Sequence, residues 1–562
     1  MALRRTDTAA TPSLSAPASD RRRPLPRTLD GSRILWFLAL AIGLLYVVVF
    51  VLQVPRDITQ LGWDASVGSS FVMPETLVKT GTGGLTLMGS TGQWVPLWFG
   101  LLTATLPLHR ELWGVAPTLL FVASALTVAW SVLQVGDRRA AALAALIGVA
   151  ASPPSLAFLM APFSHNVVYP CTALLGAYLI WLARGQRRRR LIAFAVPPLM
   201  GVVIGTCLAS DVLLATTGVI PLALTAILAG IRRDRRSRVL SLSALSTVAV
   251  AIPIAKLTST TMGSLGYTTL PTPFKLAALS ELPSRAKLLF EGLKALFNGN
   301  LAGAEEPGTL HAPLGLASDV VMCAALLTLV AVGIHVTVRF TASGVRNRAA
   351  EAPAQLARSL HIIYWVTSAA CACGAFWIAG EGPVTTHYSY YETVVFSVAA
   401  VVPLLALGSA PARWLIPVGA SIFFAAGVVG LDGDYLNIAA PLARSAPQIE
   451  RIARANDVPY GYSNWADASG LTWGMHSRVK IRPVVECATQ QGTTLCPGFQ
   501  TFVPSWYVPE QRHTFLLVEA NGVDLSGVPE ILGKPLAVYS FEAMRMYIYP
   551  YDIASRFGSG SG

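Results

Sequence analysis

Charged residues are scarce in this chain of 562 residues, where Asp, Glu, Lys and Arg make up 13%. An average soluble domain carries about 25%. Hydrophobic residues make up 53%, and the mean hydropathy is +0.54. A soluble protein of this length could not cover its surface with so few charges. The same figures exclude a disordered chain, a collagen and a coiled coil, so the composition predicts a polytopic membrane protein.

Lysine is also scarce, because seven of the 42 basic residues are lysines and the other 35 are arginines. A net charge of +12 can indicate binding to nucleic acid. Here, however, the arginines form short clusters between apolar runs, as the positive charges on the cytoplasmic side of membrane proteins do. We therefore expect membrane lipids, and no nucleic acid, as partners.

Apolar runs of about 20 residues are candidate transmembrane helices. The sequence contains eleven, at about 34–54, 114–134, 140–160, 166–183, 191–209, 212–230, 239–260, 314–338, 360–379, 392–408 and 413–430. Arginine clusters occupy alternate connections, whereas the connections at 161–166, 210–211 and 380–391 contain neither Lys nor Arg. This alternation predicts a plasma-membrane protein with a cytoplasmic N-terminus and an external C-terminus.

The predicted fold is an all-α polytopic membrane bundle of about 11 transmembrane helices with a C-terminal extracytoplasmic mixed α/β domain. An amphipathic stretch at 282–297 is expected to lie on the outer leaflet. The predicted regions are a disordered cytoplasmic N-terminus (1–33), the membrane domain (34–430), the external domain (431–557) and a cloning remnant (558–562).

Cysteines and metal-ligand motifs are few. Of seven cysteines, Cys487 and Cys496 lie in the predicted external domain with eight residues between them. An oxidising compartment permits a disulfide there, and two free thiols are the alternative. The sequence contains no H-E-x-x-H motif and no paired C-x-x-C motifs. It therefore predicts no metal site and no cofactor. A requirement for a divalent cation is left as an open alternative.

Two carboxylates stand beside predicted spans, where charge is expensive and usually functional. Asp211 lies at the external mouth between the fifth and sixth spans, and helix capping is its alternative role. Asp64 follows the first span in Leu61-Gly-Trp-Asp-Ala-Ser66, and a solvated loop carboxylate is the alternative there. Asp57 and Glu75 are its rivals in the same loop.

A histidine and an amide lie in another short external connection, at His165 and Asn166. Both are well placed to bind an anionic head group, and helix capping is the alternative. The stretch 385–392 contains His387, three tyrosines including Tyr388 and Tyr390, and Glu392. These side chains suit contacts with a sugar or a phosphate, and an interfacial aromatic belt is the alternative.

External cations that could meet a lipid phosphate are sparse: Lys79, Arg110, Lys256 and Lys275. The external domain contains Trp465 and Trp473, whose aromatic faces could stack on a glycan. Packing in the core of that domain is their alternative role.

This arrangement resembles the GT-C superfamily of membrane glycosyltransferases over about residues 34–430. Members have about eleven or more spans, a cytoplasmic N-terminus and a catalytic acid in the first external loop, the position of Asp64. The resemblance implies an enzyme that takes a sugar from a polyprenyl-phosphate donor at the outer face of the plasma membrane. Actinobacterial cell-wall arabinosyl- and mannosyltransferases are the nearest class. The C-terminal region, with Asn464-Trp-Ala-Asp467 and Leu471-Thr-Trp473, resembles the soluble external domain that some bacterial members append.

The implied reaction is an inverting transfer of an arabinose- or mannose-type sugar to a cell-envelope glycan or glycolipid. Asp64 would be the general base, because a hydroxyl acceptor is a poor nucleophile. Asp211 would orient a substrate. The phosphate would contact His165, Asn166, His387, Tyr388, Tyr390 and Lys275. An O-antigen-ligase-like or polymerase-like enzyme and a lipid or solute transporter are the alternative functions.

The alternating arginines lead to a testable topology. Reporter fusions should place residue 235 in the cytoplasm and residue 500 outside. Residue 235 lies in an arginine cluster, and an odd number of predicted spans lies between it and residue 500. Finding both residues on the same side of the membrane would rule out the eleven-span topology.

Overall fold

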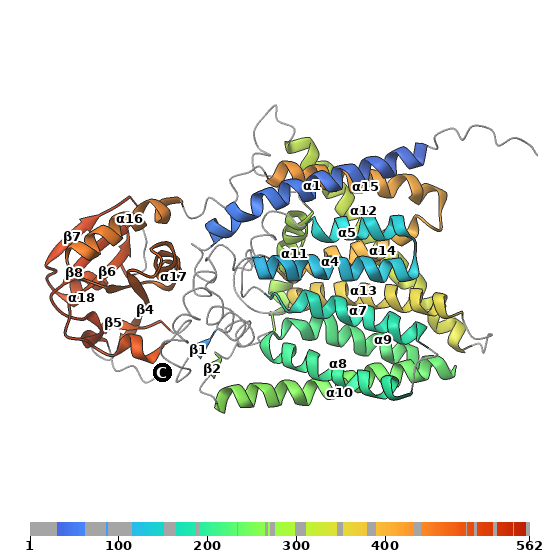
Figure 1. The fold of residues 1–562 in the computed structure, drawn as a ribbon, viewed down its shortest axis with the longest axis horizontal. Helices are drawn as coiled ribbons and strands as arrows, with labels where there is room; N and C mark the ends of the chain where they lie inside the picture. Colours follow the sequence, from blue (N-terminus) through green and yellow to red (C-terminus); the bar gives the residue numbers. More distant parts are fainter. Residues whose placement is uncertain are drawn as a thin grey trace, which may run out of the picture.

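A computed structural model gives the architecture of the chain. It describes residues 31–61, 86–87, 115–150, 165–185, 190–232, 234–264, 268–269, 276–297, 311–345, 352–378, 389–431, 440–489, 492–498, 503–520, 525–542 and 544–557. Long helices run roughly side by side in one part of the molecule, and a sheet domain lies beyond one end of them (Figure 1).

The helical bundle extends over the first three quarters of the chain. Its helices are α1 (Gly31–Leu61), α4 (Val115–Val135), α5 (Arg138–Val149), α7 (Val168–Arg184), α8 (Arg190–Ser210), α9 (Ile220–Ile231), α10 (Arg235–Ser264), α11 (Leu282–Leu296), α12 (His311–Val345), α13 (Pro353–Ile378), α14 (Ser389–Leu405) and α15 (Ala410–Leu431). Short elements join them: a π-helical turn η2 (Ala215–Val219), a 3-10 turn η3 (Leu279–Glu281), and the parallel strands β1 (Thr86–Leu87) and β2 (Thr268–Thr269).

Each predicted span coincides, at least in part, with a helix of the bundle. Within the described residues, six helices are long and apolar enough to cross a membrane. Four shorter apolar helices accompany them, at Val168–Arg184, Ala195–Ser210, Ala215–Ile231 and Glu392–Leu405. These lengths and compositions are those of a multi-pass membrane protein. The total of eleven crossings stays a prediction, since the third span (140–160) continues past the described residues.

The centre of the bundle is built from large side chains on α7, α13 and α14. Tyr364 and Trp365 of α13 are fully buried, with their rings packed edge to face at 5.5 Å between centroids. Gly176 of α7 lies against both rings, and a Cβ there would come within 3.1 Å of Tyr364. The absence of a side chain at this glycine therefore lets α7 pack closely on α13.

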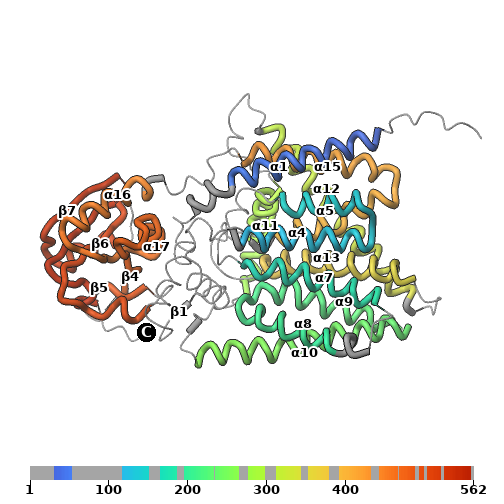
Figure 2. The backbone as a smooth tube through the Cα atoms, viewed as in Figure 1, coloured from blue at the N-terminus to red at the C-terminus, as the bar shows by residue number. Residues whose placement is uncertain are grey.

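Helices α8 and α10 run side by side at one edge of the bundle (Figures 1 and 2). Gly201 and Gly205 are one helical turn apart on α8 and face α10. A Cβ at Gly201 would lie 2.7 Å from the carbonyl oxygen of Thr247, and one at Gly205 would lie 2.6 Å from that of Ala251. This is the small-residue spacing that brings membrane helices into backbone contact.

The amphipathic helix α11 packs against the bundle. Its apolar residues Leu293 and Leu296, together with Phe297, are buried in the core of the bundle. Trp377 of α13 donates a hydrogen bond from Nε1 to the carbonyl oxygen of Leu282, at 2.9 Å. The apolar face is therefore covered by the other helices. The position of this helix on the outer leaflet stays a prediction.

The C-terminal domain is a six-stranded mixed sheet with helices, as the mixed α/β prediction requires. Its elements are α16 (Ala440–Ala455), β3 (Tyr460–Ser463), α17 (Trp465–Gly474), β4 (Lys480–Thr489), β5 (Gly492–Pro497), η5 (Pro504–Tyr507), β6 (Thr514–Glu519), α18 (Val528–Leu532), β7 (Ala537–Ser540), β8 (Met544–Tyr549) and η6 (Ile553–Arg556). The strand order is β5-β4-β3-β6-β8-β7, in which β3 is parallel to both β4 and β6, and the other pairs are antiparallel.

A buried carboxylate ties the end of the chain to the central strand of the sheet. Asp552 accepts hydrogen bonds at 2.8 Å from the hydroxyls of both Tyr460 and Tyr462. The guanidinium of Arg482 lies 3.6 Å from the centre of the Tyr460 ring. Burial raises the pKa of both tyrosines, so their hydroxyls remain protonated donors. The network joins β3 and β4 to the residue that caps η6, which favours a structural role.

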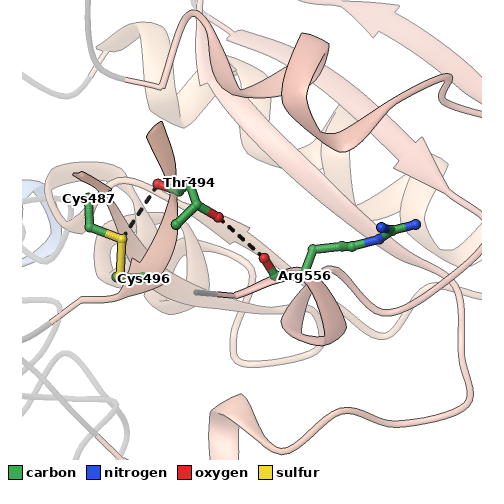
Figure 3. The surroundings of a disulfide bond; sticks show 4 residues. All are labelled: Cys487, Thr494, Cys496 and Arg556. Carbon is green, nitrogen blue, oxygen red and sulfur yellow. Dashed lines mark hydrogen bonds between the residues drawn. A yellow bond between two sulfur atoms is a disulfide. The ribbon is translucent and has the colours of Figure 1, made fainter. Parts of the chain in front are cut away.

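A disulfide joins Cys487 on β4 to Cys496 on β5 (Figure 3), the pairing that the sequence makes possible in an oxidising compartment. The two strands form an antiparallel hairpin in which Cys487 is opposite Thr494. Thr494 donates a hydrogen bond from its hydroxyl to the carbonyl oxygen of Arg556, at 3.3 Å (Figure 3). The hairpin therefore also contacts the C-terminal turn η6.

The glycine contact between α8 and α10 can be tested by adding one methyl group. Gly205→Ala should lower the thermal unfolding temperature of the purified protein, because the carbonyl of Ala251 belongs to a helix backbone and cannot move aside. The cost expected of such overpacking is about 1–3 kcal/mol.

The matched control is Gly374→Ala on α13, where an added Cβ meets no atom of the described residues within 4 Å. Alanine in an open helical position should be neutral or stabilising. Equal unfolding temperatures for the two variants would contradict the close packing of α8 on α10.

Candidate functional site

A histidine and an aspartate that lie 46 residues apart in sequence form a buried pair at one end of the bundle. The Nδ1 atom of His165 is 2.6 Å from Oδ2 of Asp211. The two residues are 8% and 2% exposed. This separation is that of a hydrogen bond, in which Nδ1 donates to the carboxyl oxygen when it carries the ring proton.

The local backbone explains how the two side chains meet. His165 precedes α7 and has a positive φ of 56°, a conformation that few residues other than glycine adopt. Asp211 follows α8, and its Oδ1 accepts a hydrogen bond from the N–H of Leu213 at 2.9 Å. One oxygen of Asp211 thus caps the next helical segment, as the alternative role supposed, and the other oxygen binds His165.

Polar groups continue into the bundle directly after Asp211. The turn η2 is π-helical, and such turns release backbone carbonyls from the regular helix pattern. The carbonyl of Thr217 in this turn accepts a hydrogen bond from the hydroxyl of Ser368 on α13, at 2.7 Å. The hydroxyl of Thr217 lies 3.1 Å from that of Thr172 on α7. These bonds join three elements immediately below the His165–Asp211 pair.

A further carboxylate, Glu392, is buried in the first turns of α14. It is 0% exposed, and its two carboxyl oxygens find no hydrogen-bond partner among the residues that the structure describes. One turn along, Phe396 packs against Tyr169 of α7, with 5.8 Å between ring centroids. Since Glu392 precedes Phe396 by four residues and His165 precedes Tyr169 by four, both lie toward the same end of the bundle.

Sequence reasoning treats Glu392 as part of the tyrosine-rich stretch and does not single it out. The signal that could have found it is a carboxylate with an apolar run directly after it. Such a residue begins a membrane helix and has little access to water unless a loop opens onto it.

The other predicted site residues have different outcomes. Asn166 is buried beside His165. Asp64, Lys275, His387 and Tyr388 lie outside the described residues, and Tyr390 belongs to α14 but its side chain is not among those described. The structure therefore brings together His165, Asn166 and Asp211, and leaves the roles of the others as predictions.

The two tryptophans predicted to bind an acceptor lie on α17, on the side of the sheet domain that faces the bundle (Figure 1). Trp473 is 7% exposed and belongs to the hydrophobic cluster that fills the bundle, and Trp465 is half-buried. The preceding Asn464 caps α17 by accepting a hydrogen bond from the N–H of Asp467. The Asn464-Trp-Ala-Asp467 motif thus has a structural explanation as a helix start.

Within the described ranges, no group of three or more His, Cys, Asp or Glu side chains is arranged to hold a metal ion.

Comparisons with known proteins give limited information. No family model and no curated protein matches the chain. Among solved structures, the chain is similar to the crystal structure of ArnT from Cupriavidus metallidurans in the apo state, with 13% sequence identity and a TM-score of 0.44. The match covers 92% of this chain and 99% of that chain. A likeness of this size does not establish a shared fold, so the function is inferred from the chain's own residues.

The His165–Asp211 bond can be measured by a double-mutant cycle with His165→Ala, Asp211→Ala and the combined variant. Thermal unfolding of the purified protein should give a coupling of about 1–3 kcal/mol, because each single change leaves a buried polar partner. The backbone strain of alanine at a positive φ occurs in both variants that contain it and therefore cancels. Additive effects of the two changes would show that the residues do not interact.

Proposed function

We propose that this protein is a GT-C-type glycosyltransferase that moves a sugar from a polyprenyl-phosphate donor to a cell-envelope glycan or glycolipid outside the plasma membrane. The observation that carries the proposal is the buried His165–Asp211 pair at an end of an apolar bundle. That end is also where α1 finishes and beyond which the sheet domain lies (Figure 1). It is the end that the arginine pattern predicts to be external.

The location fits chemistry on a lipid-linked substrate. A polyprenyl phosphate keeps its chain in the bilayer and its sugar at the surface, so the reacting atoms must lie where helices meet the water-facing domain. The bundle provides ionisable groups at that level in His165, Asp211 and Glu392, although such groups are expensive near lipid.

The reaction is a direct displacement at the anomeric carbon. The acceptor oxygen forms a bond to that carbon as the bond from the carbon to the phosphate oxygen breaks, which inverts the configuration. The acceptor proton passes to a carboxylate acting as general base. The departing phosphate gains negative charge, which hydrogen-bond donors and cations stabilise.

The roles are assigned as follows. Asp64 is the general base, because it comes three residues after the last residue of α1 and matches the position of the acid that the GT-C resemblance implies. Asp211 orients a substrate from across the site, with its geometry held by His165 and the N–H of Leu213. His165 and Asn166 contact the donor phosphate, together with Lys275 and the His387–Tyr390 stretch.

The substrates proposed are an arabinose- or mannose-type sugar on the donor and a hydroxyl-bearing envelope glycan as acceptor. Trp465 and Trp473 are proposed to contact the acceptor, which is supported by the position of α17 between the sheet and the bundle (Figure 1). Trp465 is the better candidate of the two for stacking, because Trp473 is more deeply buried.

The test is to compare carboxamide variants in a transfer assay with purified protein and a polyprenyl-phosphate sugar. Asp64→Asn keeps the size of the side chain but removes the base, and transfer should fall by roughly 100-fold or more. Asp211→Asn should impair transfer by a smaller factor, since it disturbs orientation. Glu530→Gln, at an exposed position of α18, is the matched control and should leave the rate unchanged.

Donor binding and thermal unfolding should be the same for Asp64→Asn as for the unmodified protein. A wild-type transfer rate in Asp64→Asn would place the base elsewhere, among Asp57, Glu75, Asp211 and Glu392. No transfer of any polyprenyl-phosphate sugar by the unmodified protein would overturn the proposed function.

A further inference from the structure

At the opposite end of the bundle from the His165–Asp211 pair, a cleft of about 300 Å³ opens between α1, α5, α14 and α15. The arginine pattern predicts that this end is cytoplasmic. The lining residues are Ser32, Arg33, Trp36, Asp137, Arg139, Ala140, Pro403, Ala406, Leu407 and Arg413.

The cleft carries excess positive charge. Its lining contains three arginines, Arg33, Arg139 and Arg413, and one carboxylate, Asp137. Within the described part of the chain, none of the three guanidinium groups is paired with a carboxylate. One oxygen of Asp137 is already used, since it accepts a hydrogen bond from the N–H of Ala140 at 2.8 Å. The lining therefore offers at least two uncompensated positive charges to an anion.

The backbone reinforces that preference. Asp137 caps the N-terminus of the twelve-residue helix α5, so the positive end of this helix points at the cleft. Arg413 is held at the rim by a hydrogen bond from its Nε to the carbonyl oxygen of Ala406, at 3.3 Å. A rim cation that is already positioned loses less freedom on binding an anion than a mobile surface arginine does.

The surroundings of the cleft are apolar, which distinguishes a lipid from a small anion. Trp36 and Leu407 form part of the lining. Close in sequence to the lining residues Trp36 and Arg413, Phe37 on α1 is 74% exposed and Leu415 on α15 is 68% exposed. Trp414 packs on Gly31, where a Cβ would be 2.7 Å from its ring. The arginines of the lining would suit the phosphate of a lipid head group. The exposed apolar sides of α1 and α15 would suit its acyl chains.

We propose that this cleft binds the head group of an anionic glycerophospholipid from the membrane leaflet at that end of the bundle. Basic pockets between membrane helices on the cytoplasmic side recognise such head groups. The lipid phosphate would contact Arg33, Arg139 and Arg413, and would thereby bridge α1, α5 and α15. The acyl chains would lie along the exposed faces of α1 and α15.

The site is tested by native mass spectrometry and thermal unfolding of the full chain in detergent, with phosphatidylglycerol, phosphatidylcholine or inorganic phosphate added. Phosphatidylglycerol should be retained and should raise the unfolding temperature, because a ligand of the native state stabilises it. Each of Arg33→Gln, Arg139→Gln and Arg413→Gln should weaken retention by about fivefold, the factor expected for one basic residue at a lipid surface.

The matched control is Arg138→Gln, which lies in the same turn of α5 as Arg139, is also exposed, and does not line the cleft. It should retain the lipid as the unmodified protein does. Arg139→Lys should restore most of the binding lost in Arg139→Gln, because it restores the charge.

Three results would overturn the proposal. Equal losses in Arg138→Gln and Arg139→Gln would show a diffuse attraction of the whole basic end. Equal retention of phosphatidylcholine would show that negative charge is not recognised. Binding of inorganic phosphate at the same concentration, with loss of the lipid, would identify a site for a free anion.

Discussion

Backbone hydrogen bonding inside an apolar environment is the constraint on which the rest of this structure depends. In a bilayer, each N–H and C=O must find a partner within the protein, and helices satisfy this requirement internally. Departures from regular helix are costly there, and several of them collect around one location. His165 has a positive φ, and Asp211 ends one helix and caps the next. The π-helical turn at Ala215–Val219 follows immediately. The irregular backbone and the buried ionisable pair therefore occur together.

Much of the bundle could be predicted, because a long apolar run has few alternatives to a membrane helix. The sequence also singles out His165 and Asp211 separately, from the polarity of two short connections. It does not predict that they touch, since nothing in a single sequence links two positions 46 residues apart. From the sequence, helix capping and a role in the site are alternatives for Asp211. In the structure the two are compatible, because one carboxyl oxygen caps the next helical segment and the other contacts His165.

Other features could not be read from the sequence for identifiable reasons. The amphipathic pattern of α11 reports an apolar face but not what covers it, and the covering surface is protein. The glycines of α8 are spaced for close contact, but their partner α10 is a separate helix that follows α9 in the chain. Glu392 stands at the end of a tyrosine-rich stretch whose aromatic character dominates its interpretation. In each case, local pattern gives the property and only the tertiary structure gives the partner.

Trp473 has a consequence for how the C-terminal domain can be studied. Its indole lies in the sheet domain by sequence, yet it belongs to the hydrophobic cluster of the bundle. An isolated fragment that begins near Ala440 would present this large apolar surface to water. Aggregation of such a fragment would therefore say little about whether the sheet folds on its own. Conversely, the difference between the emission spectra of the unmodified chain and of Trp473→Phe would report whether this indole is buried against the bundle.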